Sequence, residues 1–294
     1  MEFLSQKINN NSTLSHRGQE PEKGVLYVVA TPIGNLSDIS SRALNILENV
    51  FLIACEDTRQ TKKLMNKYKI SNKMISFNKT NNFHKIPKII NYLKEGSSIA
   101  LVSDAGLPGI CDPGEELVKE ASIIGLRIVC IPGPSAVLTA LVSSGLPSSK
   151  FIFEGFLPKK KSLREKVLIE ISKNSKTTIF FESPNRLKQT LKELKEHCGG
   201  EREIKVSREL TKRFEEHVGF NINEVIDFFS QKEVLGELTI ILKGINNTDK
   251  QDIDKFALRR ELKDLIEAGL SLSAASKYLA RKENLTKKTV YNLL

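Results

Sequence analysis

The sequence has 294 residues, of which 40% are hydrophobic and 6% aromatic. This balance is typical of a globular protein and excludes a disordered chain, and no apolar run approaches the roughly 20 residues that a membrane span requires. The net charge of +10 would favour a polyanionic partner such as nucleic acid, although a charge surplus for solubility explains it equally well.

Residues 1–23 are polar and lack an apolar signal core, so we expect a flexible extension there. From residue 24 to 146, apolar β-branched runs alternate with segments that carry apolar residues at helical spacing. Strands are expected at 25–31, 51–55, 99–103 and 126–131. Helices are expected at 40–48, 59–67, 83–94, 115–124 and 135–143. This alternation predicts an α/β domain over 24–146 with a mostly parallel sheet covered by helices.

A Gly, Pro and Ser cluster at 144–150 predicts a domain boundary. Strands are then expected at 151–154, 177–181, 204–208, 215–219 and 237–242, with a long helix at 185–197. Because these strands follow one another more directly, we expect a mixed sheet in an α+β domain over 147–245. After a polar linker, the segment 255–294 predicts a small unit of three helices, the last capped by Thr286.

Cysteine and histidine residues are scattered singly, four of each, without the spacing of a metal site, so we expect no bound metal. Cys55 and Cys130 lie in apolar runs and are expected to be buried free thiols. Free thiols are typical of the reducing cytoplasm, which is the compartment we expect.

Loops that could bind a ligand follow the first two expected strands. The first, TPIGN, contains Gly34, which allows a tight turn or a close approach to a ligand; a simple turn is an equally good interpretation. The second begins with Glu56 and Asp57, followed by Arg59. These side chains could orient a substrate or accept a proton, but for Asp57 alone a helix N-cap is slightly favoured.

The loop SDAGLPGICDPG, residues 103–114, holds five Gly and Pro residues within nine positions. Such a loop forms a rigid wall, poor in side chains, against which a flat ligand can lie. Asp104 could accept hydrogen bonds from an amine or hydroxyls of that ligand, whereas Asp112 is explained as the cap of the next helix. The loop IPGPS at 131–135 could hold a carboxylate at a helix N-terminus, although a plain helix start explains it as well.

Basic residues in the second half could face a phosphate backbone. Arg208 ends an expected strand, and Lys212 and Arg213 follow it, within and just after the motif SRELTK. The lysine run at 159–161 could do the same, although such a run is more often a solvated surface.

Eight motifs occur in one order along the chain: TPIGNLSDIS, EDTRQT, LVSDAGLPGICDPG, IPGPSAVLTAL, FEGFLP, FFESPNR, SRELTK and GELTIIL. This order closely resembles the small-subunit ribosomal RNA methyltransferases of the tetrapyrrole (corrin/porphyrin) methylase superfamily, over nearly the whole chain. The resemblance implies two α/β domains with S-adenosylmethionine (SAM) in the cleft between them, usually in a homodimer. The implied reaction is 2′-O-methylation of a cytidine ribose in 16S ribosomal RNA of the small subunit, at cytidine 1402 of the decoding centre.

The resemblance also assigns site residues. The implied SAM contacts are Pro32, Ser103, Asp104, Ala105, Gly106, Pro108, Pro132, Pro134, Ser135, Ala136, Phe181 and Glu182. For the chemistry we expect a carboxylate to remove the hydroxyl proton, from among Glu56, Asp57 and Glu209. The basic residues Arg59, Arg208 and Lys212 are expected to position phosphate or stabilise the oxyanion. Leu107 and Asn82 depart from the family pattern, which usually has Thr and Glu there.

Two other functions compete with this interpretation. A methylase of the same superfamily that acts on a small tetrapyrrole would not need the basic charge or the C-terminal helices. A helix-turn-helix regulator led by residues 255–294, with Lys277, Arg281, Lys282, Lys287 and Lys288 on its surface, would leave the first 242 residues unexplained. An accessory RNA-docking role fits the C-terminal helices better.

Overall fold

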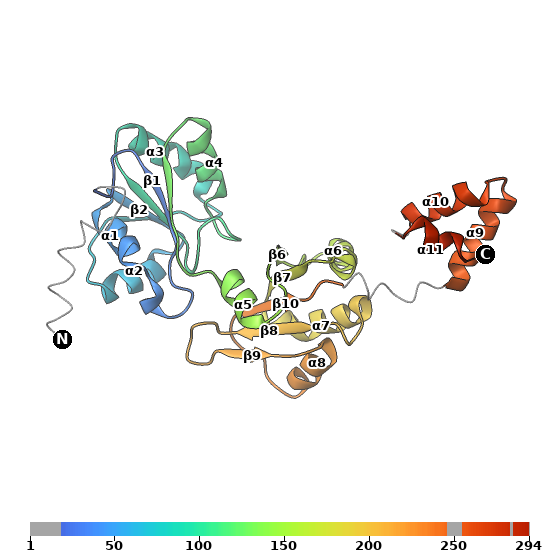
Figure 1. Cartoon of the computed structure of the whole chain (residues 1–294). Coiled ribbons are helices and arrows are strands. Elements are labelled where there is room, and N and C mark those ends of the chain that lie inside the picture. Colours follow the sequence, from blue (N-terminus) through green and yellow to red (C-terminus); the bar gives the residue numbers. More distant parts are fainter. Residues whose placement is uncertain (1–18, 246–254, 283–284, 294) are drawn as a thin grey trace. The chain divides into compact units, whose positions relative to one another are not determined.

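The computed structural model describes residues 19–245, 255–282 and 285–293 and divides into two compact units (Figure 1). The first unit runs to Ser172 and continues from Lys176 to Lys243, and the second comprises Lys173–Ser175 and the chain from Gly244 onward. Among the described residues, no helix is both long enough and apolar enough to cross a membrane.

The first sheet of the larger unit is parallel throughout, in the order β3-β2-β4-β1-β5. Its strands are β1 (Leu26–Val29), β2 (Leu52–Cys55), β3 (Met74–Ser76), β4 (Ile99–Val102) and β5 (Ile128–Ile131). Four of them confirm the expected strands, and the edge strand β3 was not predicted. Cys55 is buried as expected, but the prediction for Cys130 is wrong, because this residue lies on the edge strand β5 and is exposed.

Helices cover both faces of this sheet, as predicted. α1 (Ser41–Asn49) and α2 (Thr58–Lys67) pack on the face that Tyr27 and Val29 share, after the short 3-10 helix η2 (Leu36–Asp38). α3 (Asn82–Lys94) and α4 (Glu115–Ile123) pack on the face of Leu26 and Leu101. Successive strand residues point to opposite faces, so an uninterrupted apolar run is what a doubly covered strand requires.

The position of β1 beside β4 fixes where a ligand site belongs. The chain leaves β1 through α1 on one face, and it leaves β4 through α4 on the opposite face. The two loops therefore diverge at the carboxyl ends of neighbouring strands. This is the topological switch point, where open α/β sheets bind their ligands.

The second sheet of the larger unit is mixed, as predicted, with the order β6-β7-β10-β8-β9. Only β6 and β7 are parallel. The strands are β6 (Phe151–Phe156), β7 (Thr177–Glu182), β8 (Ile204–Arg208), β9 (Glu216–Val218) and β10 (Leu238–Leu242). On one face lie α6 (Lys161–Lys173), α7 (Pro184–Cys198) and α8 (Ile222–Ser230), of which only α7 was predicted. The lysine run at 159–161 leads into α6.

The other face of the second sheet is covered by α5 (Ala136–Ser144). Val137, Ala140 and Leu141 of this helix pack with Ile179 and Ile241 of the sheet. The sequence placed this helix in the first domain, before a boundary at 144–150. In the structure the helix belongs to the core of the second sheet, and both sheets lie in one compact unit.

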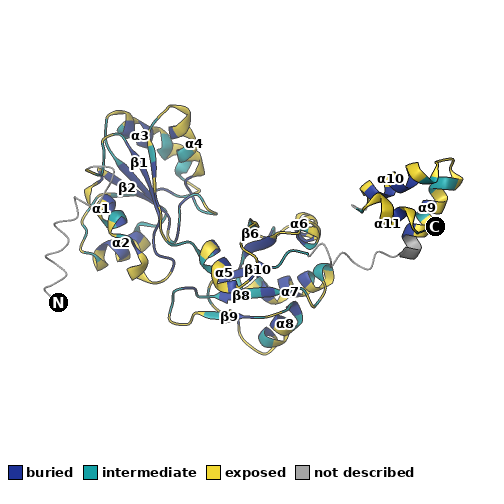
Figure 2. Cartoon of the chain, in the orientation of Figure 1, coloured by how far each residue is buried: buried dark blue, intermediate teal, exposed yellow. Residues whose placement is uncertain are grey.

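The second unit contains α9 (Lys255–Glu267), α10 (Leu272–Lys282) and α11 (Lys287–Tyr291). Leu258, Leu262, Leu279 and Val290 are buried in a core of its own, and Thr286 caps α11 as predicted. The outward-facing positions of these helices are exposed (Figure 2), and they include Arg259, Lys277 and Lys287.

Part of the predicted N-terminal extension, residues 1–18, lies outside the described residues, as does most of the linker. The remaining residues of the extension contact the first sheet's helices and loops, because Glu20 pairs with Arg42 and Glu22 with Arg127.

Candidate active site

The carboxylates of Glu56, Asp104 and Asp112 gather at the carboxyl ends of β2 and β4. The backbone N–H of Asp104 lies 3.4 Å from Glu56 Oε2, and Asp104 Oδ1 accepts the N–H of Asp57 at 3.0 Å. Asp112 lies further along the loop after β4. The negative charges of Glu56 and Asp104 are close enough to destabilise its ionised form. Lys79 is one of the cations near this cluster, and its ammonium donates to the carbonyl of Cys111 at 2.7 Å.

Proton affinities in this carboxylate cluster are raised. Burial raises the pKa of Glu56 and that of Asp104 above their ordinary values. Burial, reinforced by the charge of Glu56, raises the pKa of Asp112 to about 6. The cluster therefore contains one group, Asp112, that can take up a proton near neutral pH.

Asp112 does not have the capping role that the sequence predicted. α4 begins at Glu115, its N-cap is Gly114 with φ 145°, and no side chain caps it. A residue with a side chain is strained at such a φ, so glycine occupies the cap and the carboxylate of Asp112 is left beside Glu56. The only signal for this in the sequence is the presence of a second acid in the loop.

Asp57, in contrast, is an N-cap. Its carboxylate accepts the N–H of Arg59 at 2.8 Å and pairs with the Arg59 side chain at 2.6 Å. These bonds lower the pKa of Asp57 to about 2. A carboxylate of such low proton affinity is a poor base, whereas the guanidinium of Arg59 is 87% exposed and accessible to a phosphate.

The glycine-rich loop after β4 is fixed to the loop after β1. Thr31 and Gly106 exchange two backbone hydrogen bonds, of 2.8 and 3.1 Å. Ser103 is buried and bonds to carbonyls of its own loop, and Pro32 and Pro108 are buried as well. Asp104 projects from this rigid frame and is exposed. The loop thus has the wall that its composition predicted, with the exposed side chain of Asp104 on it.

The loop after β5 forms the neighbouring edge of the site. Ser135 caps α5 by accepting the N–H of Leu138, and Pro132 is exposed. Gly133 is required because a Cβ there would lie 2.9 Å from the Cβ of Ala30. Pro134 contacts the first wall, since its carbonyl lies 3.7 Å from the place of a Cβ on Gly106. Ala105 and Ala136, also implied contacts, are half-buried in these two loops.

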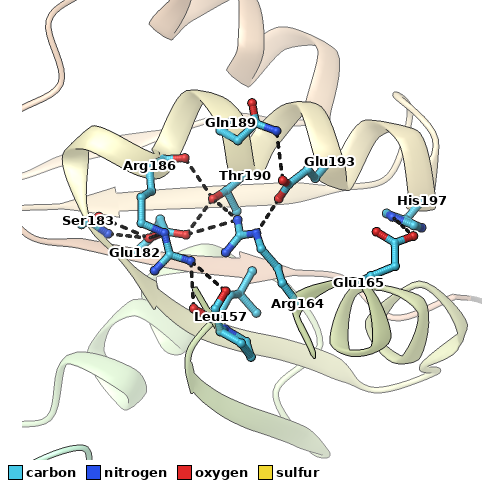
Figure 3. Close-up of polar contacts among 11 residues, drawn as sticks. Leu157, Arg164, Glu165, Glu182, Ser183, Arg186, Gln189, Thr190, Glu193 and His197 are labelled. Atoms are coloured by element: carbon cyan, nitrogen blue, oxygen red, sulfur yellow. Dashed lines mark hydrogen bonds and ion pairs between the residues drawn. The ribbon is translucent and has the colours of Figure 1, made fainter. Parts of the chain in front are cut away.

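Phe181 and Glu182, at the end of β7, have different environments. Phe181 packs edge-on against Phe153, with 5.0 Å between the ring centroids. Its ring centroid lies 5.5 Å from that of Phe156, which is exposed. The side chain of Glu182 is fully buried within a network on α6 and α7 (Figure 3). Its oxygens accept from the N–H of Ser183 at 2.8 Å and the hydroxyl of Thr190 at 2.6 Å.

Two guanidinium groups complete the surroundings of Glu182, from Arg164 at 3.7 Å and Arg186 at 3.4 Å. Arg164 also binds Glu193 at 2.6 Å. The carboxylate of Glu182 therefore stabilises the second domain and is not available to SAM, which corrects the role that the resemblance implied for this side chain.

Arg208, Glu209 and Lys212 lie together at the end of β8, each already paired. Arg208 binds Glu216 at 3.1 Å, and Lys212 binds Glu209 at 2.9 Å and Glu237 at 3.1 Å. Burial raises the pKa of Glu209, but the bonds from Lys212 and from the Glu237 N–H outweigh it and lower the pKa overall. Burial lowers the pKa of Lys212, and the two carboxylates reverse this, so that the ammonium stays charged.

The turn after β8 contacts the loop after β1. A Cβ on Gly34 would lie 2.5 Å from Lys212 Cγ and 2.9 Å from the carbonyl oxygen of Leu210. The N–H of Asn35 donates to Thr211 Oγ1 at 3.0 Å. Gly34 is thus explained by the approach of another part of the protein, and the first sheet's ligand loops meet the second sheet's basic turn.

A parallel α/β sheet joined to a mixed sheet defines a class of fold, and comparison with known proteins identifies that class. The family described as Tetrapyrrole (Corrin/Porphyrin) Methylases matches residues 25–226. Among solved structures, the methyltransferase CobJ has a TM-score of 0.57 at 16% identity, covering 75% of this chain and 94% of that one. Uroporphyrin-III C-methyltransferase from Thermus thermophilus complexed with S-adenosylhomocysteine has a TM-score of 0.52 at 16% identity, covering 74% and 96%.

Relatives found by sequence identify a narrower group within this family. A protein named ribosomal RNA small subunit methyltransferase I from Bacillus subtilis is 42% identical over 275 residues, which are 92% of this chain and 94% of the relative. One of the same name from Thermotoga maritima is 47% identical, over 75% of this chain and 99% of the relative. The chain belongs to the tetrapyrrole methylase family and, within it, to the ribosomal RNA small subunit methyltransferases I.

Proposed function

We propose that this protein transfers the methyl group of SAM to the ribose 2′-oxygen of a cytidine in small-subunit ribosomal RNA, cytidine 1402 of the decoding centre. The names of its relatives support the RNA substrate, and the net charge of +10 suits a polyanion. The observation that carries the proposal is the exposed carboxylate of Asp104, held at the switch point by the bridge between Thr31 and Gly106. We propose the cytoplasm as the compartment, and the small subunit or its RNA as the partner.

The residues at the switch point suit SAM. An exposed acid at Asp104 can accept hydrogen bonds from an amine or ribose hydroxyls, and the backbone of the 132–135 loop lies beside the wall. Phe181, between Phe153 and Phe156, offers an aromatic face. When bound, SAM supplies an electrophilic methyl group on a sulfonium.

The chain's own contribution is alignment and removal of a proton. Of the three carboxylates expected as base, Asp57 and Glu209 are paired with cations and have lowered pKa values. Glu56 is half-buried with a raised pKa, so we propose Glu56 as the base. Arg59 is the exposed cation for phosphate, and Arg208 and Lys212 must exchange their carboxylate partners to bind RNA.

Methyl transfer from labelled SAM tests the function. The purified protein is offered undermodified small subunits, naked small-subunit RNA and a tetrapyrrole in parallel. We expect label in the RNA at a cytidine ribose, found by nuclease digestion and mass spectrometry. Label in the tetrapyrrole alone would refute the proposal.

Two variants separate the sites within this function. We expect Asp104→Ala to lose SAM binding in equilibrium dialysis, and Arg208→Ala to keep SAM binding but lose RNA turnover. Glu120→Gln, at an exposed position on α4, is the control. Unchanged SAM affinity in Asp104→Ala would refute the assignment of the switch-point loops.

We further propose a homodimer. α5 buries one side against the second sheet and leaves Leu138 and Val142 51% and 74% exposed on the other. Exposed apolar side chains on a helix are typical of a surface that a second subunit covers. Sedimentation equilibrium of the full chain measures the mass, and a monomer at micromolar concentration would contradict the proposal.

A further inference from the structure

A chain of hydrogen bonds leads from the second sheet to the loop after β1. Ser207 Oγ lies 2.9 Å from His217 Nδ1, and His217 Nε2 lies 3.0 Å from Glu215 Oε1. The other oxygen of the same carboxylate accepts the N–H of Thr211 at 2.7 Å. Thr211 Oγ1 accepts the N–H of Asn35 at 3.0 Å, so five residues are linked in series.

The fixed end of this chain is in the sheet. Ser207 is fully buried and lies opposite His217 in the register of β8 and β9. Because an ionised carboxylate can only accept, His217 Nε2 must carry a proton, and Nδ1 of a neutral ring then accepts the Ser207 hydroxyl. Glu215 is thus held by a side chain that is itself held by the sheet.

The other end of the chain lies in a strained turn. Thr211 has φ 64° and Glu209 has φ 52°, both in the left-handed region that residues with side chains rarely adopt. Such a conformation persists only where its surroundings enforce it, and it often marks a functional site. At Thr211 the enforcing contact is the carboxylate of Glu215, and the result is that Oγ1 meets the N–H of Asn35.

We propose that Glu215 and His217 are positioning residues for methyl transfer, acting through Thr211 on the backbone of Asn35. They hold the loop 31–35 against the turn that carries Arg208, Glu209 and Lys212. The inference rests on the proposed function, because this loop contains the SAM contact Pro32 and this turn contains the residues assigned to RNA. Donor and acceptor then stay in one alignment, on which the rate of a displacement depends steeply.

Variants of the full chain test this role. Thr211→Val keeps the shape of the side chain and removes the acceptor, and Thr211→Ser restores it. Glu215→Gln replaces one of the two accepting oxygens with an NH2 group, so the bonds to Thr211 and His217 can no longer both be kept in their present form. Glu120→Gln is the matched control. Amide hydrogen exchange at Asn35, SAM affinity by calorimetry and kcat with small subunits are measured for each.

Thr211→Val and Glu215→Gln should speed exchange at Asn35 and lower kcat, each about tenfold, as expected for one lost hydrogen bond. SAM affinity should stay within about twofold, because the loops after β4 and β5 are untouched. Thr211→Ser should behave as wild type. Wild-type exchange at Asn35 or wild-type kcat in Thr211→Val would overturn the inference. Exchange and calorimetry need no RNA, so they decide whether loop 31–35 is held even if the methyl-transfer assay refutes the proposed function.

Discussion

Asp112 shows how a residue's surroundings decide its protonation. The folded protein raises its pKa to about 6 by burial, with the charges of Glu56 and Asp104 adding to the effect, while an unfolded chain leaves it near 3.8. The folded state therefore holds this proton more tightly. Its contribution to stability is fully present below about pH 4 and is lost as the pH rises through about 6.

We expect Asp112→Asn to raise the free energy of unfolding at pH 7.5 by about 1 kcal/mol, because the asparagine side chain cannot ionise in the buried position. The full pKa shift corresponds to a larger energy, which the partial exposure of the side chain reduces. At pH 4.5, where most of the wild-type carboxyl is already neutral, the gain should largely vanish. Urea unfolding at both pH values measures this. An equal gain at both would contradict the raised pKa.

Glu182 illustrates what the sequence does not contain. A Glu at a strand's end beside Phe181 resembles a ligand contact, but Arg164, which helps to neutralise it, lies on α6, a helix that the sequence did not predict. Burial by a partner 18 positions away is a tertiary property. The exposure of Asp104 was predictable because the composition of its loop alone indicates a rigid wall.

Removing the buried acid should be costly. We expect Glu182→Ala to lower the free energy of unfolding by about 3–5 kcal/mol, since the guanidinium groups of Arg164 and Arg186 both lose a fully buried anionic partner (Figure 3). Glu165→Ala is the control, because Glu165 is half exposed and pairs only with His197 among the contacts in Figure 3. Urea denaturation compares the two, and an equal, small loss in both would argue against a structural role.

At the scale of elements, the strands of the first sheet were predictable because burial on both faces demands long apolar runs. β3 was missed because it has three half-buried residues at an edge. α8 was not predicted although Asn221 caps it, because nine residues between two strands give only a short helical pattern of apolar residues. α5 was predicted as a helix, but nothing in its apolar pattern says which of two sheets it covers.

Contact between the β1 loop and the β8 turn is the element-scale feature most easily tested. We expect Gly34→Ala to lower the free energy of unfolding by about 1–3 kcal/mol and to slow methyl transfer, because the new methyl group would overlap the Leu210 carbonyl and Lys212. Ser37→Ala, at an exposed position of the same segment, is the control. Thermal unfolding and turnover are measured together; wild-type behaviour of Gly34→Ala would show that the two loops do not meet.

At the scale of the whole molecule, the chain combines a methylase unit with a separately cored helical unit. The Thermotoga relative is matched over 99% of its length by 75% of this chain, so a protein of the same name is shorter by about a quarter. We therefore expect the helices from 255 onward to assist RNA binding without being essential for chemistry. Their net charge, nine basic against four acidic residues over 255–294, suits that role.

Removing two exposed cations of this unit should weaken RNA binding without touching the cofactor. We expect Lys277→Gln/Lys288→Gln to bind small subunits several-fold more weakly and to reduce the slope of log affinity against log salt by about 1–2, as for lost phosphate contacts. SAM affinity should not change. Filter binding over a salt series measures this against Lys94→Gln/Lys119→Gln, exposed on α3 and α4. Identical salt-dependence slopes in the two double variants would contradict a role of the C-terminal helices in RNA binding.

The strand order of the second sheet has a consequence for synthesis on the ribosome. β10 is made last of its five strands, yet it lies in the middle, between β7 and β8. Until residues 238–242 leave the exit tunnel, β7 and β8 have no partner between them, and the apolar side of α5 has lost part of its cover. The first sheet can form while the chain is still being synthesised, but the second sheet cannot form until β10 is available. An enzyme that we assign to the ribosome would therefore complete its own active site only once nearly all of its methylase unit has been translated.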